Sequence, residues 1–235
     1  MKGIDPALSR TRSFTRRGDR MPRTHQAAWD RLAAQAVLDV PRPRPGSTLV
    51  DPAYRLDPEQ VFGRQAPLVV EVGPGSGDAL VHAATTHPEV DFLALEVWRP
   101  GIGHALAKMG EQALPNVRFV EADAAPVLTT LLEPGSVHEV WTFFPDPWPK
   151  NKHHKRRLVD AEFADTVADL LPPGGLWRLA TDWAAYAVAM RQVLDPHSRW
   201  ELVGTDRAPL RPVTRFERRG TEAGRSITDL TYAVR

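Results

Sequence analysis

The sequence has 235 residues, of which 42% are hydrophobic and 25% are charged, with a formal net charge of +1 and no cysteine. These values are typical of a soluble globular protein and exclude disulfides, thiolate metal sites and a strongly basic surface over the whole chain. No apolar run is long enough to span a bilayer, and the first residues lack the apolar centre of a signal peptide. We therefore expect a cytoplasmic protein without membrane contact, and no metal, because the histidines show no ligand spacing.

Positive charge is concentrated in the N-terminal segment, where residues 1–25 hold seven lysines or arginines and two aspartates. Apolar positions at helical spacing predict a helix over residues 24–38, and the Pro-Arg repeat at 41–46 predicts an extended linker. A basic segment of this kind is also what a solubilising disordered tail looks like. We divide the chain into a basic N-terminal extension, residues 1–46, and one α/β domain, residues 47–235.

A glycine-rich turn follows the first apolar strand, Leu68–Val72. The turn reads Gly73-Pro74-Gly75-Ser76-Gly77, and Asp78 opens a helix over 79–86. Glycines at alternate positions let the backbone turn sharply and approach a ligand closely. Asp78 stands where a dinucleotide fingerprint has its third glycine, and its carboxylate would repel a pyrophosphate at the helix start. The turn therefore predicts a nucleoside ligand without phosphates, and Glu71 in the strand suits an amino group.

Two more acids follow predicted strands. Glu96 ends the strand over 90–97, about 20 residues after the glycine turn, where a carboxylate meets ribose hydroxyls in this architecture. Asp123 ends the strand over 116–123. An acid at that place serves either a ligand or, more often when taken alone, as the cap of a helix over 124–132. Glu96 has a similar alternative as a surface acid at a strand end.

The most unusual stretch is the loop after the strand predicted over 137–144. It reads Phe143-Phe144-Pro145-Asp146-Pro147-Trp148-Pro149 and leads directly into a run of cations and histidines, 150–157. Prolines stiffen the backbone and fix the direction of a bound substrate, Asp146 and Trp148 supply a charge and a stacking wall, and the cations can take phosphates. The alternative is a solvated basic turn.

The remaining pattern alternates helices and strands. Helices are predicted at 102–111, 158–171 and 186–194, and strands at 176–181, near 200–203 and at 228–234. A second basic loop is predicted over 207–220. The chain therefore predicts an α/β fold with a mostly parallel central sheet and helices on both faces. The basic segments at 10–23, 150–157 and 207–219 then form a phosphate-binding rim at the carboxyl edge of the sheet.

Three motifs together identify a family resemblance. They are Phe143–Trp148 followed by Lys150 and Lys155-Arg156-Arg157, then Ala180-Thr181-Asp182-Trp183, and Arg211–Glu217. With Glu-x-Gly-x-Gly-x-Gly at 71–77, the sequence resembles the tRNA (guanine-N7-)-methyltransferases of the bacterial single-chain type, from about Ser13 to the C-terminus. Pro149 before Lys150 and the Pro-Arg linker depart mildly from the family pattern.

The resemblance implies a Rossmann-like class I methyltransferase domain with a C-terminal antiparallel strand, S-adenosyl-L-methionine as methyl donor and tRNA as partner. The target would be N7 of a guanosine in the variable loop, and no obligate protein partner is expected. Asp146 would be the catalytic acid. The donor would be bound by Glu71, Gly73, Gly75, Gly77, Glu96, Asp123 and Asp146. The tRNA would be bound by Lys150, Asp182, Thr214, Arg215, Phe216 and Glu217.

The chemistry of guanine N7 agrees with this residue set. N7 carries an in-plane lone pair and no proton, so methyl transfer needs positioning and charge placement rather than a base.

Three other functions share part of the pattern. An adenine or cytosine amino-methyltransferase has a similar Asp-Pro loop, a nicotinamide dehydrogenase would need the phosphate-compatible turn that Asp78 spoils, and a non-catalytic RNA-binding module leaves the acids at three strand ends unexplained.

Overall fold

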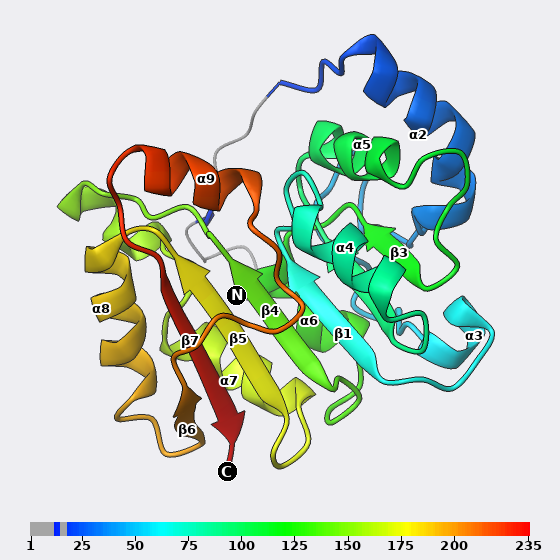
Figure 1. Cartoon of the computed structure of the whole chain (residues 1–235). Coiled ribbons are helices and arrows are strands. Elements are labelled where there is room, and N and C mark those ends of the chain that lie inside the picture. The colour runs from blue at the N-terminus through cyan, green and yellow to red at the C-terminus, as the bar shows by residue number, and fades with distance from the viewer. Residues whose placement is uncertain (1–11, 15–17) are drawn as a thin grey trace.

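The computed structural model describes residues 12–14 and 18–235. In this part of the chain the core is a seven-stranded sheet in the order β3-β2-β1-β4-β5-β7-β6 (Figure 1). The strands are β1 (Leu68–Val72), β2 (Asp91–Leu95), β3 (Val117–Val120), β4 (Glu139–Phe143), β5 (Leu176–Thr181), β6 (Trp200–Gly204) and β7 (Thr228–Val234). Strands β1 to β5 pair in parallel, and β7 pairs antiparallel with both β5 and β6. The predicted mostly parallel sheet with a C-terminal antiparallel strand is confirmed.

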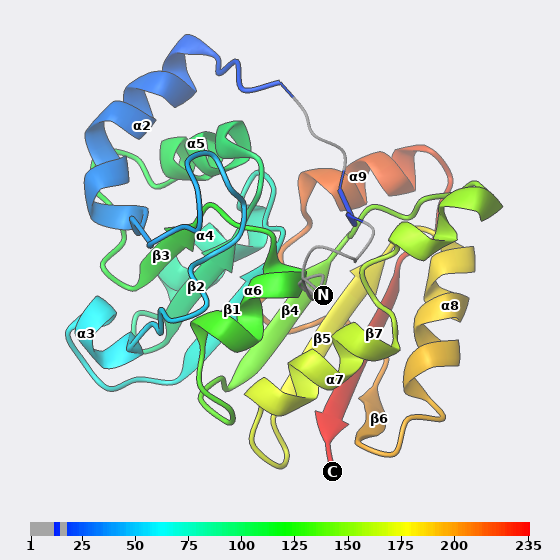
Figure 2. The same cartoon turned by 180° about the vertical axis from the view of Figure 1, so that it is seen from behind.

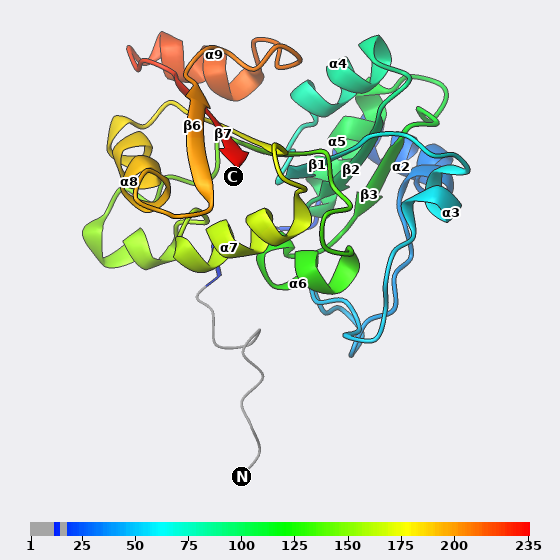
Figure 3. The same ribbon diagram turned by 90° about the horizontal axis from the view of Figure 1, so that it is seen from below.

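Helices cover both faces of this sheet (Figures 1 to 3). One face carries α2 (Arg23–Ala36), α4 (Asp78–Thr86) and α5 (Arg99–Lys108). The other carries α6 (Ala124–Leu131), α7 (Ala161–Leu170) and α8 (Ala184–Leu194), with the short α3 (Pro58–Phe62) packed at its border. Both faces of the central strands are therefore buried, which explains why β1 and β2 are apolar except for Glu71 and Asp91.

Successive residues of the central strands alternate between the two apolar clusters. Val69 and Phe92 belong to the cluster under α2, α4 and α5, whereas Val70 and Leu93 belong to the cluster over α6 and α7. The strand period of two produces this division. The register pairs Val69 with Phe92 and Val70 with Leu93, so each cluster receives matched rows from neighbouring strands.

Helix α2 confirms the helix predicted over 24–38 and packs against α5. Its residues Ala28, Leu32 and Ala36 are buried in the same cluster as β1 and β2. After the helix, Val37 forms a parallel bridge with Phe119 of β3. The domain boundary at residue 46 stays a prediction, and α2 shares the core of the domain that follows. The basic positions before residue 12 and at 15–17 lie outside the described residues.

The prediction of a second basic loop over 207–220 is wrong in part, because helix α9 (Arg215–Glu222) begins inside this stretch. Thr214 caps this helix by accepting a hydrogen bond from the Glu217 backbone N–H at 3.1 Å. The sequence Thr-x-x-Glu at 214–217 has the form of a capping box and predicts a helix start, but the many arginines around it made the stretch resemble a loop. A 3₁₀ helix, η1 (Asn151–Arg156), also lies inside the first basic run.

The glycine turn between β1 and α4 has the left-handed backbone that its sequence predicts. Gly73, Gly75 and Gly77 have φ of +69°, +56° and +68°. A Cβ on Gly77 would lie 2.5 Å from the Cβ of Ala105 on α5. The last glycine is therefore needed both for its φ and for the close approach of α4 to α5.

We predict that Gly77→Ala destabilises the fold through both effects. Gly63→Ala is a matched control, because Gly63 has φ of +70° and a Cβ added there would meet nothing within 4 Å. The control should cost about 1–2 kcal/mol, the strain of a left-handed alanine. Overpacking against Ala105 should add about 1–3 kcal/mol, a further fall in Tm of roughly 3–9 °C. Equal melting temperatures for the two variants would show that the Ala105 contact relaxes freely.

Candidate functional site

A cleft of about 340 Å³ lies at the carboxyl ends of β1, β2 and β4. The strand order reverses between β1 and β4, and open α/β sheets bind ligands at such a switch point. The predicted site residues that line the cleft are Glu71, Gly73, Gly75, Glu96, Asp123, Asp146, Thr214, Arg215 and Phe216. Outside its lining lie Gly77, Lys150, Asp182 and Glu217.

Glu71 is the most deeply buried acid of the cleft, with 3% of its surface exposed. Burial raises its pKa to about 8, and the negative charges of Asp78 and Glu96 act in the same direction. Its Oε2 atom is buried and has no hydrogen-bond partner among the residues that the structure describes. An unsatisfied carboxyl oxygen is costly inside a protein, so this atom marks a place where a ligand amino group or ammonium fits.

Glu96 fixes the geometry of the glycine turn. Its Oε2 accepts from the Gly75 backbone N–H and its Oε1 from the Trp98 backbone N–H, both at 2.9 Å. The side chain is 8% exposed and lines the cleft. One carboxylate therefore links the end of β2 to the turn after β1, and each of its oxygens can accept a second hydrogen bond.

Asp123 stands at the N-cap position of α6, but its side chain makes no capping hydrogen bond. The helix-cap alternative for this residue is therefore not realised, and its carboxylate lines the cleft instead. Its backbone N–H donates to Thr48 O at 2.9 Å, which ties the end of β3 to the segment after the Pro-Arg linker.

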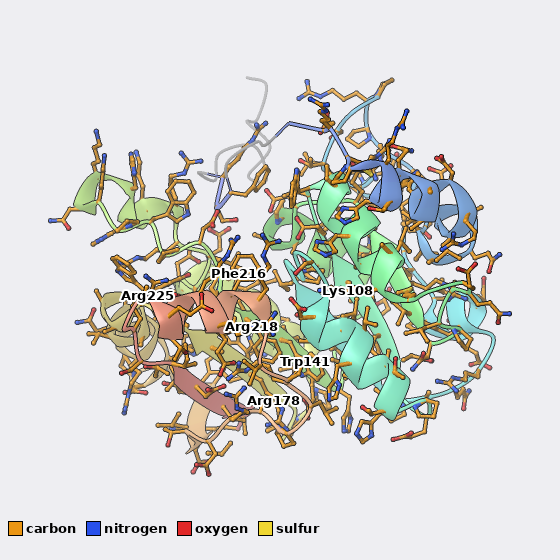
Figure 4. All side chains as sticks on the ribbon, turned by 45° about the horizontal axis from the view of Figure 1, so that its top comes forward. Lys108, Trp141, Arg178, Phe216, Arg218 and Arg225 are labelled. Carbon is orange, nitrogen blue, oxygen red and sulfur yellow. The ribbon has the colours of Figure 1, made fainter. Side chains whose placement is uncertain are left out.

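Asp78 keeps its negative charge at the start of α4. Burial opposes ionisation, but hydrogen bonds from Lys108 Nζ at 2.6 Å and Ser76 Oγ at 2.8 Å hold the pKa of Asp78 below its usual value. The Arg215 backbone N–H also points to this carboxylate, at 3.4 Å. Figure 4 shows Lys108 on α5 and Phe216 on α9, the two helices that meet this acid. An ionised acid here disfavours a ligand phosphate at the helix start, as the sequence indicates.

The loop after β4 carries two strained residues. Phe144 and Trp148 are the non-glycine residues with positive φ among those described, at +53° and +44°. Left-handed backbone costs about 1–2 kcal/mol for such residues, so the surroundings must hold it. One anchor is the Phe144 backbone N–H, which donates to Ala180 O of β5 at 2.7 Å. Asp146 lies between the strained residues and is exposed at the cleft.

Trp148 and Arg156 hold the N-terminal segment against this loop. Trp148 Nε1 donates to Ser13 O at 2.9 Å, and the Arg156 guanidinium stacks 4.0 Å from the centre of the Trp148 ring. Arg156 also donates to the backbone oxygens of Arg12 at 3.1 Å and Phe14 at 2.8 Å. The stacking wall predicted at Trp148 is therefore covered by Arg156 on one face. Ser13 and Phe14 line the cleft, and nothing in the basic N-terminal pattern singled them out.

The predicted phosphate-binding rim needs a correction, because two of its arginines are buried. Arg157 is 8% exposed and Arg211 is 2% exposed. Arg211 forms ion pairs with Glu217 and with Asp229, so it serves the fold. A sequence run of cations does not reveal which members point inward. Exposed cations remain in both basic runs, and two of them, Arg215 and Arg219, line the cleft. We call this set the cationic rim: Lys150, Lys152, Lys155, Arg215, Arg218 and Arg219.

The other predicted tRNA-binding residues hold α9 in place. Glu217 is 4% exposed and pairs with Arg207 and Arg211. Burial alone would raise its pKa, but these two guanidinium groups keep the pKa below the usual range. Asp182 accepts from Arg225 Nε at 2.8 Å, and a Cβ on Gly220 of α9 would lie 2.8 Å from the Cβ of Asp182. Their contact with tRNA stays a prediction.

Sequence reasoning also missed cleft residues on helices and connecting loops. Trp98, His104 and Arg219 line the cleft. Trp98 follows Glu96 closely, which is the one signal that could have indicated it. Among residues 12–14 and 18–235, no group of three or more acids and histidines is placed to hold a metal ion.

No helix in the described part of the chain combines the length and apolar character needed to cross a bilayer.

Comparison with known proteins gives one consistent result. The profile of a family described as "Putative methyltransferase" matches residues 65–230. A tRNA (guanine-N(7)-)-methyltransferase of Paenarthrobacter aurescens is 51% identical over 80% of this chain, which spans 62% of that relative. One of Nocardioides sp. is 46% identical over 95% of this chain and 87% of its own length. The crystal structure of the 16S rRNA methyltransferase KamB has the same fold, with a TM-score of 0.57 and 18% identity over 75% of this chain and 91% of its own.

We predict that Glu71 makes stability depend on pH in the absence of ligand. Its pKa of about 8 lies above the usual value of 4.5, so the folded protein retains a proton that the unfolded chain releases. The stabilising contribution is complete below about pH 4.5 and is lost as pH rises through 8. Glu71→Gln mimics the protonated acid, so wild type and variant should melt together near pH 5, and the wild type should melt lower near pH 8.

Thermal denaturation at pH 5, 6, 7 and 8 measures this difference. The exposed acid Glu201 provides the control, because Glu201→Gln should shift Tm equally at every pH. A Glu71→Gln difference that stays constant from pH 5 to 8 would contradict the assignment of a buried, protonated carboxyl.

Proposed function

Because this chain belongs to the tRNA (guanine-N7-)-methyltransferase family, we propose that it methylates N7 of a guanosine in tRNA with S-adenosylmethionine as donor. The observation that carries the proposal is the convergence of acids from successive strand ends, Glu71, Glu96 and Asp123, on one cleft with the Asp146 loop opposite. The ionised Asp78 at the start of α4 disfavours the pyrophosphate of a dehydrogenase cofactor, and a passive RNA-binding module leaves these acids unexplained. The variable loop as target and the cytoplasm as location stay predictions.

The cleft fits the donor residue by residue. The Glu71 Oε2, which has no partner within the described part of the chain, suits the ammonium of the methionine part, and the buried acid would ionise beside that cation. Glu96 presents oxygens to the ribose hydroxyls, and Asp123 to the adenine amino group. When bound, the donor supplies a methyl group on a positively charged sulfur.

Asp146 has the position to receive the target base. It lies at the mouth of the cleft on a stiff loop, where its carboxylate can accept from the N–H groups of guanine and stabilise the positive charge that reaches the purine. Guanine N7 has no proton to remove, so the residues act by orientation and charge. The cationic rim reaches the same cleft through Arg215 and Arg219 of α9, and its exposed side chains can bind tRNA phosphates.

Incubation with labelled donor and bulk tRNA, followed by digestion and nucleoside analysis, tests the function. Labelled 7-methylguanosine is the expected product. A methylated exocyclic amino group on adenosine or cytidine would replace the proposal with the amino-methyltransferase alternative. No transfer to any tRNA, with the donor bound, would reject a tRNA substrate.

We predict that Glu96→Ala weakens donor binding at least tenfold, because it removes the ribose acceptor and also releases the Gly75 and Trp98 N–H groups. Calorimetry with donor alone measures the effect. Glu121→Ala is the matched control, since Glu121 follows β3 but pairs with Arg99 outside this cleft. Affinity for tRNA should change little in either variant. Normal donor affinity in Glu96→Ala would remove this residue from the donor site.

We predict that Asp146→Asn lowers kcat by about two orders of magnitude, the scale of one lost preorganised charge, while tRNA still binds. At saturating donor, wild-type kcat should stay level between about pH 6 and 8, because no base is required. Steady-state kinetics across this range measure both. Near-wild-type turnover by the variant, or a steep rise of kcat with pH, would contradict this role for Asp146.

A further inference from the structure

The loop that carries Asp146 has almost no backbone donors with which to anchor itself. Pro145, Pro147 and Pro149 have no N–H, so between Phe144 and Lys150 the loop offers mainly carbonyl oxygens. Phe144 and Trp148 hold unfavourable left-handed φ values at the two ends. A donor from elsewhere in the protein is therefore needed to fix the middle of the loop.

Arg157 supplies that donor. Its Nε donates at 3.0 Å to the carbonyl oxygen of Pro147, the residue directly after Asp146. Its guanidinium stacks 4.9 Å from the centre of the Tyr186 ring of α8. Tyr186 is fully buried, and its hydroxyl accepts from the Val159 backbone N–H at 3.2 Å. In Figures 1 and 2 the light-green η1 segment before Arg157 lies beside α8. The arginine is thus clamped between a rigid helix and the loop.

The surroundings of Arg157 do not favour the stability of the folded protein. Arg157 is 8% exposed, and in the described part of the chain its Nη2 is buried without a hydrogen-bond partner and no ion pair joins it to an acid. A buried cation with an unsatisfied N–H is a cost that an apolar side chain of the same volume would avoid. The favourable contact that only a donor side chain can make here is the hydrogen bond from Arg157 Nε to the Pro147 carbonyl oxygen.

We propose that Arg157 is a positioning residue that holds the Pro147 carbonyl and thereby aims the Asp146 carboxylate at the substrate base. The proposal rests on the proposed methyl transfer. It assigns Arg157 a role through Asp146 and not, as the sequence run indicated, a phosphate contact. An Asp146 carboxylate displaced by a fraction of an ångström or turned away from the base would lose much of its effect on the transition state.

The test is a double-mutant cycle on single-turnover methyl transfer with Arg157→Met, Asp146→Asn and the double variant. Arg157→Met should slow transfer at least about tenfold at saturating substrates, with donor and tRNA affinities within about twofold of wild type. In the Asp146→Asn background the same change should cost less than about twofold, because the group it positions is already gone. Arg157→Lys retains a cationic donor and should recover part of the rate.

Arg178→Met is the matched control, because Arg178 is also a partly buried arginine but pairs with Glu139 at the amino end of β4, away from the cleft (Figure 4). It should leave the transfer rate unchanged. Full additivity of Arg157→Met and Asp146→Asn would overturn the proposal. So would weaker tRNA binding with a reduced salt dependence and a normal saturated rate, the signature of a phosphate contact.

Two further outcomes are separable. If Arg157→Met does not fold, the cycle with Arg157→Lys decides in the same way, by additive or non-additive losses. If the wild type transfers no methyl group to tRNA, the proposed function fails and this inference fails with it. Wild-type activity with unaffected Arg157 variants rejects the positioning role alone.

Discussion

The bidentate role of Glu96 is the interaction on which the site depends. A parallel sheet brings its strand ends to one edge, but it does not fix the turns that leave them. Glu96 accepts from Gly75 N and Trp98 N, and so joins the turn after β1 to the segment after β2. The glycines of the turn have no side chains to pack, so its shape depends on hydrogen bonds of the backbone: besides the bond to Glu96, Gly73 N–H donates to Leu95 O and Gly77 N–H to Pro74 O, both at 2.9 Å. With this carboxylate in place, Glu71 and Asp123 face the same cleft.

The second constraint lies across the cleft, in the loop after β4. Strained backbone at Phe144 and Trp148 persists only because several elements hold it from outside. Ala180 of β5 accepts from the beginning of the loop, and Arg157 donates to its middle. The two sides of the cleft are thus built differently. Carboxylates organise one by accepting from backbone N–H groups, whereas cations organise the other by donating to backbone carbonyls.

The sequence predicts the order of the strands along the chain and the placing of Glu71, Glu96 and Asp123 at the cleft, because both follow from local patterns. The sequence itself shows the apolar strands, the glycine turn and the acids that follow the strands. Parallel strands then bring such acids together at one edge of the sheet. Burial of charged residues is different. Arg157 and Arg211 stand in runs of cations, and only tertiary packing against Tyr186 or Asp229 distinguishes them from exposed neighbours. Helix α9 was hidden for the same reason, since its buried face consists of Glu217 and Gly220 rather than apolar residues.

Adjacent arginines of one motif show how far such a run can be from a uniform charged surface. Arg156 ends η1 and Arg157 follows it, and their side chains diverge at this turn. Arg156 stacks on Trp148 and reaches the backbone of residues 12–14, whereas Arg157 turns inward to Pro147 and Tyr186. Both act on the same loop, from its outer and its inner side. Arg157 donates to a backbone carbonyl of the loop itself, whereas Arg156 and the loop's Trp148 donate to backbone carbonyls of residues 12–14, so the loop is tied to the core on one side and to the N-terminal segment on the other.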